Sequence, residues 1–510
     1  LKLCIISHIK YPQLLFSGGC RLVRKKRPHY AKATRGKQMN MKLPLTIKET
    51  QEGLLKKEFS AVELVDAYLN RIKKFDKEIN AFLTVSEEIA YMQAKRIDES
   101  IHRSGKKIFD EYSLFGVTVA HKDLFLTKGV RTTAGSKVLK DYVPQYSATV
   151  VKRIEEAGAI MIGKLNCDAW AHGSSGENSD FGSTKNPWNK EYTSGGSSSG
   201  SAASLASNFC LITTGTDTCG SIRLPANYCG VYGLKPTYGS VSRYGIVAMA
   251  SSLDSIGNFG RSVDDIKRVF DVTRGEDGRD ATVANYQFPT TNFQLKPKIR
   301  IGIPREFFVE GLDKEVEKTI MESVDLLKKE GIEFKEVSLP STKYGISIYY
   351  IIQPAEVSSN LGRYDGIRYG AKRDNFGDEA KRRIMLGTYV LSAGYYDEFY
   401  LRAMKVRSKI IQEVNAVFED VDALIAPVAP TPPFKLGEKV NNPLEMYLTD
   451  IYAATANLSG IPSIAIPSGF SKKGLPLGFQ LMGPRFSEYT LFALGKFYHE
   501  LIDYKPRVAF

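Results

Sequence analysis

The sequence predicts an α/β fold in which helices cover both faces of a central mixed β-sheet. Short apolar runs typical of buried strands recur along the chain, and between them apolar residues repeat at helical spacing. Such alternation favours a covered sheet that is largely parallel or mixed. The chain has 510 residues, of which 43% are hydrophobic, so it can form a sizeable core. No run of about 18 apolar residues occurs, and no membrane-spanning helix is predicted.

The first predicted helix begins at a capping box, Ser60-Ala-Val-Glu63. Behind it Val62, Val65, Leu69 and Ile72 fall on one helical face. Three strands are then predicted, at residues 115–120, 159–163 and 209–214.

The second half of the chain repeats the pattern. Residues 299–303 and 423–426 are predicted strands, and apolar residues at helical spacing over 316–327 predict a helix between them. Gly331 is a typical helix stop, because glycine adopts the left-handed conformation after a last turn. We expect one domain over residues 41–510, with a division near residue 280 as the alternative.

The net charge of +14 comes mostly from a basic N-terminal extension, residues 1–40, which holds ten Lys or Arg and no Asp or Glu. The remainder has 60 basic and 56 acidic residues, so its charge does not indicate a nucleic-acid groove. Three interpretations of the extension stay open: sequence upstream of a start at Met39 or Met41, an organelle transit peptide, or an RNA-binding arm. We expect it to be poorly packed.

Six cysteines without CxxC pairing favour a reducing compartment. The expected location is the cytoplasm, or the mitochondrial or plastid matrix if residues 1–40 are a transit peptide. No His/Cys pattern has metal-ligand spacing, so no metal site is predicted.

The segment 193–204 is the most distinctive, with three glycines and six serines. Composition alone would fit a flexible linker, and the glycine spacing resembles a phosphate loop but lacks its lysine. Residues 196–200 also match the G-x-S-x-G hydrolase elbow. That elbow needs a preceding strand and a later histidine, and only His499 follows, so a Ser-His-Asp triad is disfavoured.

Lysine is the remaining candidate base for these serines, since a serine needs a neighbouring base to become a nucleophile. Lys122 ends a predicted strand. If it is buried, its pKa can fall by several units and the neutral amine can accept a proton. The alternative is a solvated lysine at a strand end.

Three segments resemble the amidase signature family. They are Lys122-Asp123, Gly195-Gly-Ser-Ser-Ser-Gly-Ser201 and Gly215-Thr-Asp-Thr-Cys-Gly-Ser-Ile-Arg223. The intervals of 75 residues from Lys122 to Ser197 and 24 from there to Ser221 also match. The resemblance runs from about residue 41 nearly to the end. Seven stretches are similar, more specifically, to the A subunits of glutamyl-tRNA(Gln) amidotransferases: residues 127–136, 241–246, 251–254, 382–389, 394–397, 446–450 and 457–462.

The resemblance implies a Ser-cisSer-Lys triad. Ser221 would be the nucleophile, Ser197 would relay its proton, and Lys122 would accept it. Backbone N–H groups of Thr218, Cys219 and Gly220 would hold the oxyanion of the tetrahedral intermediate.

The resemblance also implies the contacts to glutamine. Arg383 would bind the α-carboxylate, Asp450 the α-ammonium, and Tyr349 would line the same pocket. For Arg383 and Asp450 the alternative is a solvated helix position.

Observations on four side chains complete the comparison with the family pattern. Asp217 and Arg223 are expected to form a structural pair. Cys219 replaces the usual glycine and fits only where φ is negative. His121 replaces a small apolar residue, and we expect it to pack on the sheet.

By resemblance, the chain is a glutaminase subunit that supplies ammonia to a partner. The partner would convert Glu-tRNA(Gln) to Gln-tRNA(Gln), with Asp-tRNA(Asn) as a second substrate to consider. No cofactor is expected in this chain. ATP and Mg²⁺ would belong to the B subunit, which would also bind most of the misacylated tRNA, and a C subunit would complete a heterotrimer. The alternatives are a stand-alone amidase for another small amide and an inactive scaffold subunit.

Overall fold

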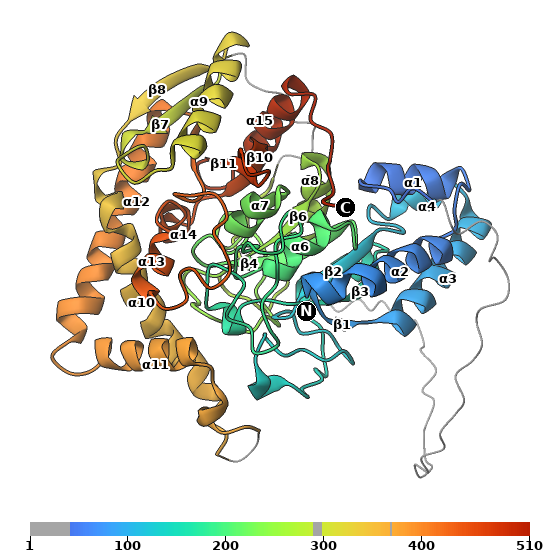
Figure 1. Ribbon diagram of the computed structural model, residues 1–510, viewed down its shortest axis with the longest axis horizontal. Helices are drawn as coiled ribbons and strands as arrows, with labels where there is room; N and C mark the ends of the chain where they lie inside the picture. Colours follow the sequence, from blue (N-terminus) through green and yellow to red (C-terminus); the bar gives the residue numbers. More distant parts are fainter. Residues whose placement is uncertain (1–40, 289–297, 368–369) are drawn as a thin grey trace, which may run out of the picture. The chain divides into compact units, whose positions relative to one another are not determined.

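An eleven-stranded mixed β-sheet organises the computed structural model (Figure 1), which describes residues 41–288, 298–367 and 370–510. The strand order is β1-β3-β2-β4-β6-β5-β10-β11-β9-β7-β8. Neighbours pair in parallel at β2–β3, β2–β4, β7–β8 and β7–β9, and antiparallel elsewhere. The predicted fold class is therefore confirmed.

The strands have the following bounds: β1 Phe82–Val85, β2 Thr118–Lys122, β3 Ile160–Leu165, β4 Ile212–Asp217, β5 Tyr232–Lys235, β6 Ser255–Gly260, β7 Arg300–Pro304, β8 Glu333–Val337, β9 Ala423–Pro427, β10 Ser463–Phe470 and β11 Pro476–Met482.

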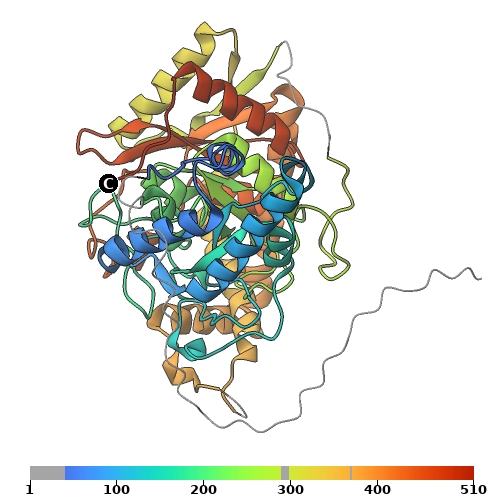
Figure 2. The same ribbon diagram turned by 90° about the vertical axis from the view of Figure 1, so that its right-hand side faces the viewer.

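Helices lie on both faces of this sheet (Figures 1 and 2). Their bounds are α1 Ile47–Leu55, α2 Ala61–Ile79, α3 Glu87–Ser104, α4 Lys107–Glu111, α5 Thr149–Glu156, α6 Ser199–Ala206, α7 Arg223–Cys229, α8 Val263–Thr273, α9 Lys314–Lys329, α10 Gly345–Asn360, α11 Asp378–Val390, α12 Arg402–Asp420, α13 Pro443–Leu448, α14 Ala454–Ser459 and α15 Glu488–Leu501. Lys42–Phe510 form one compact unit. The extension predicted for residues 1–40 lies outside the described residues.

The predicted helix signals agree with the structure. At the start of α2 the Ser60 hydroxyl accepts from the Glu63 N–H, and the Glu63 carboxylate accepts from the Ser60 N–H at 2.8 Å. The predicted helix over 316–327 lies within α9, and Gly331 beyond it has a φ of +87°.

The predicted starts of two strands differ from those in the structure. The strands predicted at 159–163, 299–303 and 423–426 correspond to β3, β7 and β9. The strand predicted at 115–120 begins only at Thr118, because the N–H groups of Phe115 and Val117 donate back to Tyr112 and Leu114 in a turn. Likewise β4 begins three residues after position 209, since the Phe209 N–H closes the end of α6 on Ser204.

The parallel pairing of β2 and β4 positions the predicted site. His121 of β2 pairs with Thr214 of β4, so both strands end at the same edge of the sheet. Lys122 ends β2, and Asp217 ends β4. Successive side chains of a strand point to opposite faces.

His121 packs against the sheet, as predicted. Its Nδ1 lies 3.2 Å from Thr214 Oγ1, and its ring stacks on Phe125. Burial lowers the pKa of His121 to about 3, so the ring is neutral at ordinary pH.

In the part of the chain that the structure describes, no helix is both long and apolar enough to cross a membrane.

Candidate active site

A buried lysine amine surrounded by hydroxyl groups forms the centre of the site. Lys122 is 0% exposed. Three hydroxyl oxygens lie within hydrogen-bond distance of its Nζ: Ser197 Oγ at 2.8 Å, Ser198 Oγ at 2.9 Å and Thr216 Oγ1 at 2.8 Å. The alternative of a solvated strand end is therefore wrong.

The surroundings of Lys122 favour its neutral form. Burial lowers the pKa of Lys122 to about 8, although Asp168 and Asp217 act in the opposite direction. The Ser198 hydroxyl donates to the Thr216 carbonyl oxygen at 3.2 Å, so at Nζ it is an acceptor. A neutral amine has one lone pair, which leaves the hydroxyls of Ser197 and Thr216 as the groups that can donate a proton to it.

The two predicted serine turns adjoin. The peptide bond between Gly196 and Ser197 is cis, and the Ser198 N–H donates to the Ser221 carbonyl oxygen at 3.2 Å. Ser221 is buried but retains 7% exposure. Among the described residues, no group forms a hydrogen bond with its hydroxyl. The Ser221 hydroxyl is thus available to a substrate.

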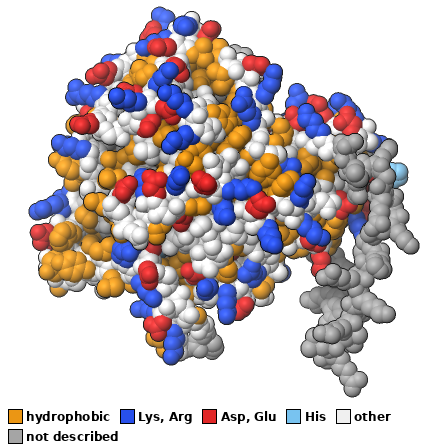
Figure 3. Space-filling model, viewed as in Figure 1, with side chains coloured by type: hydrophobic (Ala, Val, Ile, Leu, Met, Phe, Trp, Pro, Cys, Tyr) orange, Lys and Arg blue, Asp and Glu red, His pale blue; other side chains and the backbone are white. Residues whose placement is uncertain are grey.

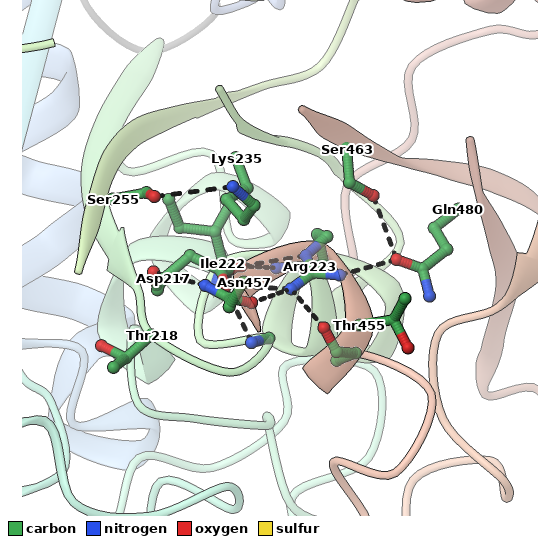
Figure 4. Close-up of polar contacts among 12 residues, drawn as sticks. Asp217, Thr218, Ile222, Arg223, Lys235, Ser255, Thr455, Asn457, Ser463 and Gln480 are labelled. Atoms are coloured by element: carbon green, nitrogen blue, oxygen red, sulfur yellow. Dashed lines mark hydrogen bonds and ion pairs between the residues drawn. The ribbon is translucent and has the colours of Figure 1, made fainter. Parts of the chain in front are cut away.

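The Asp217–Arg223 pair holds the Ser221 turn in place, and the structure confirms its predicted structural role (Figure 4). Both side chains are fully buried and joined at 3.0 Å. Although burial alone would raise the pKa of Asp217, Arg223 and the Gly220 N–H hold it well below its usual value. Arg223 also donates to Gln480 Oε1 at 2.7 Å and Asn457 Oδ1 at 2.6 Å, which ties the turn to β11 and α14.

One of the three predicted oxyanion donors is already in use. The Gly220 N–H donates to Asp217 Oδ1 at 2.8 Å, so only the Thr218 and Cys219 N–H groups remain of the three donors predicted from the sequence. Gly220 has a φ of +103°, and a Cβ there would lie 2.6 Å from the Cβ of Ala453. Cys219 does not have a positive φ, so its side chain fits the turn.

The three predicted glutamine contacts gather around Tyr350. The Arg383 guanidinium lies 5.1 Å from the centroid of the Tyr350 ring, and Asp450 Oδ2 accepts from the Tyr350 hydroxyl at 3.4 Å. The Tyr349 ring lies 4.9 Å from the Tyr350 ring. Arg383 is 2% exposed and Asp450 7%, so neither is a solvated helix position.

Two neighbours that the sequence did not predict orient Arg383. Its Nε donates to Glu379 Oε1 at 2.7 Å, and its Nη1 donates to Gln353 Oε1 at 2.8 Å. Gln353 is 0% exposed, and its Nε2 has no hydrogen-bond partner among the described residues. The available signal was helical spacing, because Gln353 lies one turn after Tyr349 and Glu379 one turn before Arg383.

Asp450 interacts with both Tyr350 and the Ser221 turn. Its Oδ2 accepts from Ser174 Oγ at 2.6 Å. Burial raises the pKa of Asp450 to about 7, against the opposing effects of Ser174 and Arg383. Burial and the Asp450 carboxylate raise the pKa of the Cys219 thiol, whereas Arg383 lowers it. The charges of Asp450 and Arg383 therefore act on the turn that carries Ser221.

No group of three or more His, Cys, Asp or Glu side chains within residues 41–288, 298–367 and 370–510 is arranged to hold a metal ion. The chemistry that this arrangement can perform is attack by a serine hydroxyl whose proton passes to a neutral lysine.

A family model described as Amidase matches residues 63–492. The chain belongs to the amidase family. This amidase-family chain is 48% identical over 465 residues to a protein of Carboxydothermus hydrogenoformans that is named as the A subunit of glutamyl-tRNA(Gln) amidotransferase, with 88% of the chain and 95% of the relative covered. The match to a family enzyme confirms the resemblance found in the sequence.

Solved structures agree with the fold of this amidase-family chain. The crystal structure of the A subunit of glutamyl-tRNA(Gln) amidotransferase from Thermotoga maritima superposes with a TM-score of 0.74 at 38% identity, covering 88% of this chain and 93% of that one. A 6-aminohexanoate cyclic dimer hydrolase has a TM-score of 0.80 at 22% identity, covers 92% and 99% of the two chains, and shares the fold.

Proposed function

We propose that this chain is the glutaminase subunit of a tRNA-dependent amidotransferase. The observation that carries the catalytic part is the 2.8 Å contact between Lys122 Nζ and Ser197 Oγ in a fully buried setting. The names of the relatives support the amidotransferase part.

In the proposed reaction, Ser221 Oγ attacks the side-chain amide carbon of glutamine. Its proton passes through the Ser197 hydroxyl to the neutral Lys122 amine. The Thr218 and Cys219 N–H groups hold the oxyanion, a contribution of roughly 3–4 kcal/mol per donor in other enzymes. Lys122 then returns the proton to the nitrogen of the amide, which departs as ammonia. The γ-glutamyl ester that remains on Ser221 is hydrolysed by water.

The glutamine backbone would lie between two charged groups. Arg383 would bind the α-carboxylate and Asp450 the α-ammonium, with Tyr349 as a wall of the pocket. The support is their common arrangement around Tyr350. An arginine and a carboxylate at one binding site would select a zwitterionic amino acid amide over a simple amide.

The released ammonia would pass to a B subunit that uses ATP and Mg²⁺ to activate the carboxylate of Glu-tRNA(Gln), and a C subunit would complete the complex. Asp-tRNA(Asn) is a second acceptor to assay.

The test is co-expression with candidate B and C subunits, followed by assays of ATP-dependent amidation of each misacylated tRNA. Glutamine should support amidation by the native complex. Ser221→Ala should abolish amidation from glutamine but keep amidation from ammonium chloride, because only the ammonia supply is lost. Glutamine-dependent amidation by Ser221→Ala would overturn the proposal. Hydrolysis of simple amides by the chain alone, without tRNA amidation, would identify a stand-alone amidase instead.

A further inference from the structure

His172 is a buried histidine that the proposed reaction does not use. Its side chain is 0% exposed, and neither ring nitrogen has a hydrogen-bond partner among the described residues. Figure 3 shows charged side chains of both signs spread over one face of the molecule, where water solvates them. A polar group inside the protein lacks that solvation, so an unpaired one is costly to bury and rare. The ring therefore indicates a partner that the described chain does not supply.

The backbone before His172 adopts a conformation that side chains rarely allow. Trp170 and Ala171 have φ values of +59° and +64°, in the left-handed region that favours glycine. The Trp170 N–H donates to the Ala134 carbonyl oxygen at 2.8 Å. The His172 carbonyl oxygen accepts from Asn178 Nδ2 at 2.6 Å. Strain of this kind is concentrated at functional sites, and here it fixes the direction of the next side chain, which is His172.

The residue two positions before His172 contacts the start of α11, the helix that carries Arg383. The ring centroids of Trp170 and Phe376 are 5.2 Å apart, and Phe376 lies two residues before α11. Burial lowers the pKa of His172 well below its usual value, and the Arg383 guanidinium lowers it further. The His172 ring is therefore neutral and within electrostatic reach of Arg383.

The residue two positions after His172 contacts the other charged group of the proposed pocket. Ser174 Oγ donates to Asp450 Oδ2 at 2.6 Å. The Ser174 carbonyl oxygen accepts from the Gly196 N–H at 2.9 Å, directly before Ser197. The segment that carries His172 therefore connects the start of α11 to Asp450 and to the turn of Ser197.

The chemistry of the ring and its neighbour selects an anionic ligand. A neutral imidazole has one N–H donor, and a guanidinium donates to carboxylates through planar N–H groups. A carboxylate has room for more hydrogen bonds than one guanidinium supplies, because each oxygen accepts about two. A carboxylate beside Arg383 would thus provide the acceptor that the His172 N–H lacks.

We propose that His172 binds the α-carboxylate of the substrate, to which its ring donates an N–H beside the Arg383 guanidinium. This inference rests on the proposed function, in which the substrate is glutamine. It adds a specificity-determining residue, because a directional donor in a buried pocket disfavours amides that have no carboxylate to accept from it.

The test uses the full chain co-expressed with candidate B and C subunits and compares two amides. Glutamine has the α-carboxylate, and 4-aminobutanamide lacks it. His172→Met removes both ring nitrogens at similar volume, and His172→Phe removes them while keeping a flat ring. The matched control is His102→Met, at an exposed position of α3. Steady-state kinetics provide KM and kcat, and thermal melting reports on folding.

The KM for glutamine should rise about tenfold in His172→Met and His172→Phe, because a hydrogen bond to a charged group is lost. The KM for 4-aminobutanamide and both kcat values should stay within about twofold of the native values. The melting temperature should not fall, since each variant removes an unpaired buried polar group. His102→Met should match the native chain throughout.

Two conservative variants identify the donating nitrogen. His172→Asn places an amide donor near the position of Nδ1, and His172→Gln places one near Nε2. One of the two should bring the KM for glutamine back toward the native value. A KM in both that equals the KM of His172→Met would contradict the donor role.

A native KM for glutamine in folded His172→Met and His172→Phe would overturn the proposal. Equal increases of KM for both substrates would overturn it as well, because they would show that the ring only supports the pocket. A native chain that hydrolyses 4-aminobutanamide but not glutamine would contradict both this proposal and the proposed function.

The two proposals also fail separately. A complex that shows the expected His172 effects on glutamine hydrolysis but amidates no tRNA contradicts the amidotransferase function and leaves the role of His172 standing. A complex that amidates tRNA with an unchanged KM for glutamine in His172→Met and His172→Phe contradicts the role of His172 alone.

Discussion

The Arg383 guanidinium donates through Nη1 to Oε1 of Gln353 at 2.8 Å, and both side chains are buried. The Gln353 Nε2, bonded to the same carbon as this acceptor oxygen, therefore lies beside the guanidinium, and it has no partner among the described residues. An unpaired buried donor next to the arginine that we propose to bind the α-carboxylate is placed to donate to the same carboxylate.

Replacement of Gln353 can separate the role of its Oε1, which accepts from Arg383, from the role of its Nε2, which we expect to donate to the substrate carboxylate. Gln353→Met removes both hydrogen-bonding atoms at similar size, while Gln353→Glu keeps an acceptor for Arg383 but adds a negative charge. We expect the KM for glutamine to rise about tenfold in Gln353→Met, because a hydrogen bond to a charged group is lost. In Gln353→Glu it should rise further, and kcat should change little in both. Steady-state glutaminase kinetics provide the measurement.

The matched substrate is 4-aminobutanamide, which lacks the α-carboxylate and should be hydrolysed equally by native chain and Gln353→Met. Ser358→Ala, on the same helix with its hydroxyl bonded to the Ala355 carbonyl, is the control variant. Equal losses on both substrates would mean that Gln353 only supports the pocket.

Lys122 should impose an alkaline requirement on activity. Because burial lowers its pKa to about 8, the neutral base forms as the pH rises through that value, and kcat/KM should rise with it. Lys122→Ala should lower kcat/KM by about 10²–10⁴-fold. The exposed Lys128→Ala should not change it. A flat profile from about pH 6 to about pH 9 would exclude Lys122 as the base.

The same pKa shift predicts how stability depends on pH. Between about 8 and the ordinary lysine value of 10.5, the unfolded chain binds a proton that the folded chain does not. The Lys122 contribution to the free energy of unfolding should therefore rise with pH across this window. Denaturant titrations of the native chain and Lys122→Met isolate this contribution. The difference between their free energies of unfolding should depend on pH only between about 8 and 10.5.

Local signals explain how much of the fold was predictable. Apolar periodicity located α2, α9, β3, β7 and β9, because the side chains that face the core recur at fixed spacing. The starts of β2 and β4 were missed by three residues. The apolar run continues there through a turn whose hydrogen bonds leave no trace in the apolar pattern.

Site residues that belong to a sequence motif could be predicted, whereas residues that reach the site only through tertiary contacts could not. Lys122, Ser197 and Ser221 stand in spaced motifs. Gln353 and Glu379 look like solvated helix residues until α10 and α11 are packed together. The engagement of the Gly220 N–H depends on the direction of the Asp217 side chain, which residue order alone does not specify.

Asp450 should make glutamine binding sensitive to pH. Because burial raises the pKa of Asp450 to about 7, the carboxylate that we propose to hold the substrate ammonium is lost as the pH falls below that value. The KM for glutamine should therefore increase on acidification, and Asp450→Asn should show a high KM that no longer varies with pH. Glutaramate, which lacks the α-amine, is the matched substrate, and its KM should be the same for both chains. A native KM that stays constant from about pH 8 to about pH 6 would contradict this role.

The Cys219 side chain should be dispensable for activity. It has no positive φ and is 3% exposed, so it fills space beside the turn without distorting it. Cys219→Gly should keep kcat/KM within about threefold and lower the free energy of unfolding by roughly 1 kcal/mol, as for a lost buried side chain and a more flexible backbone. A gain in kcat/KM well beyond this range would show that the cysteine impairs the oxyanion site.

Removal of Arg223 should unfold the turn that carries Ser221. Arg223→Met leaves Asp217 as an unpaired buried charge, which costs about 3–5 kcal/mol in such pairs. The double variant Asp217→Asn/Arg223→Met removes both charges and should recover part of this loss, measured by urea denaturation. Glutaminase activity should stay low in both, since Asp217 also holds the Gly220 N–H and the Ile222 N–H, at 2.8 Å and 3.1 Å. If the single and double variants lost equal stability, the unpaired charge of Asp217 would not account for the loss, and the turn would depend on the remaining contacts of Arg223 with Gln480 and Asn457.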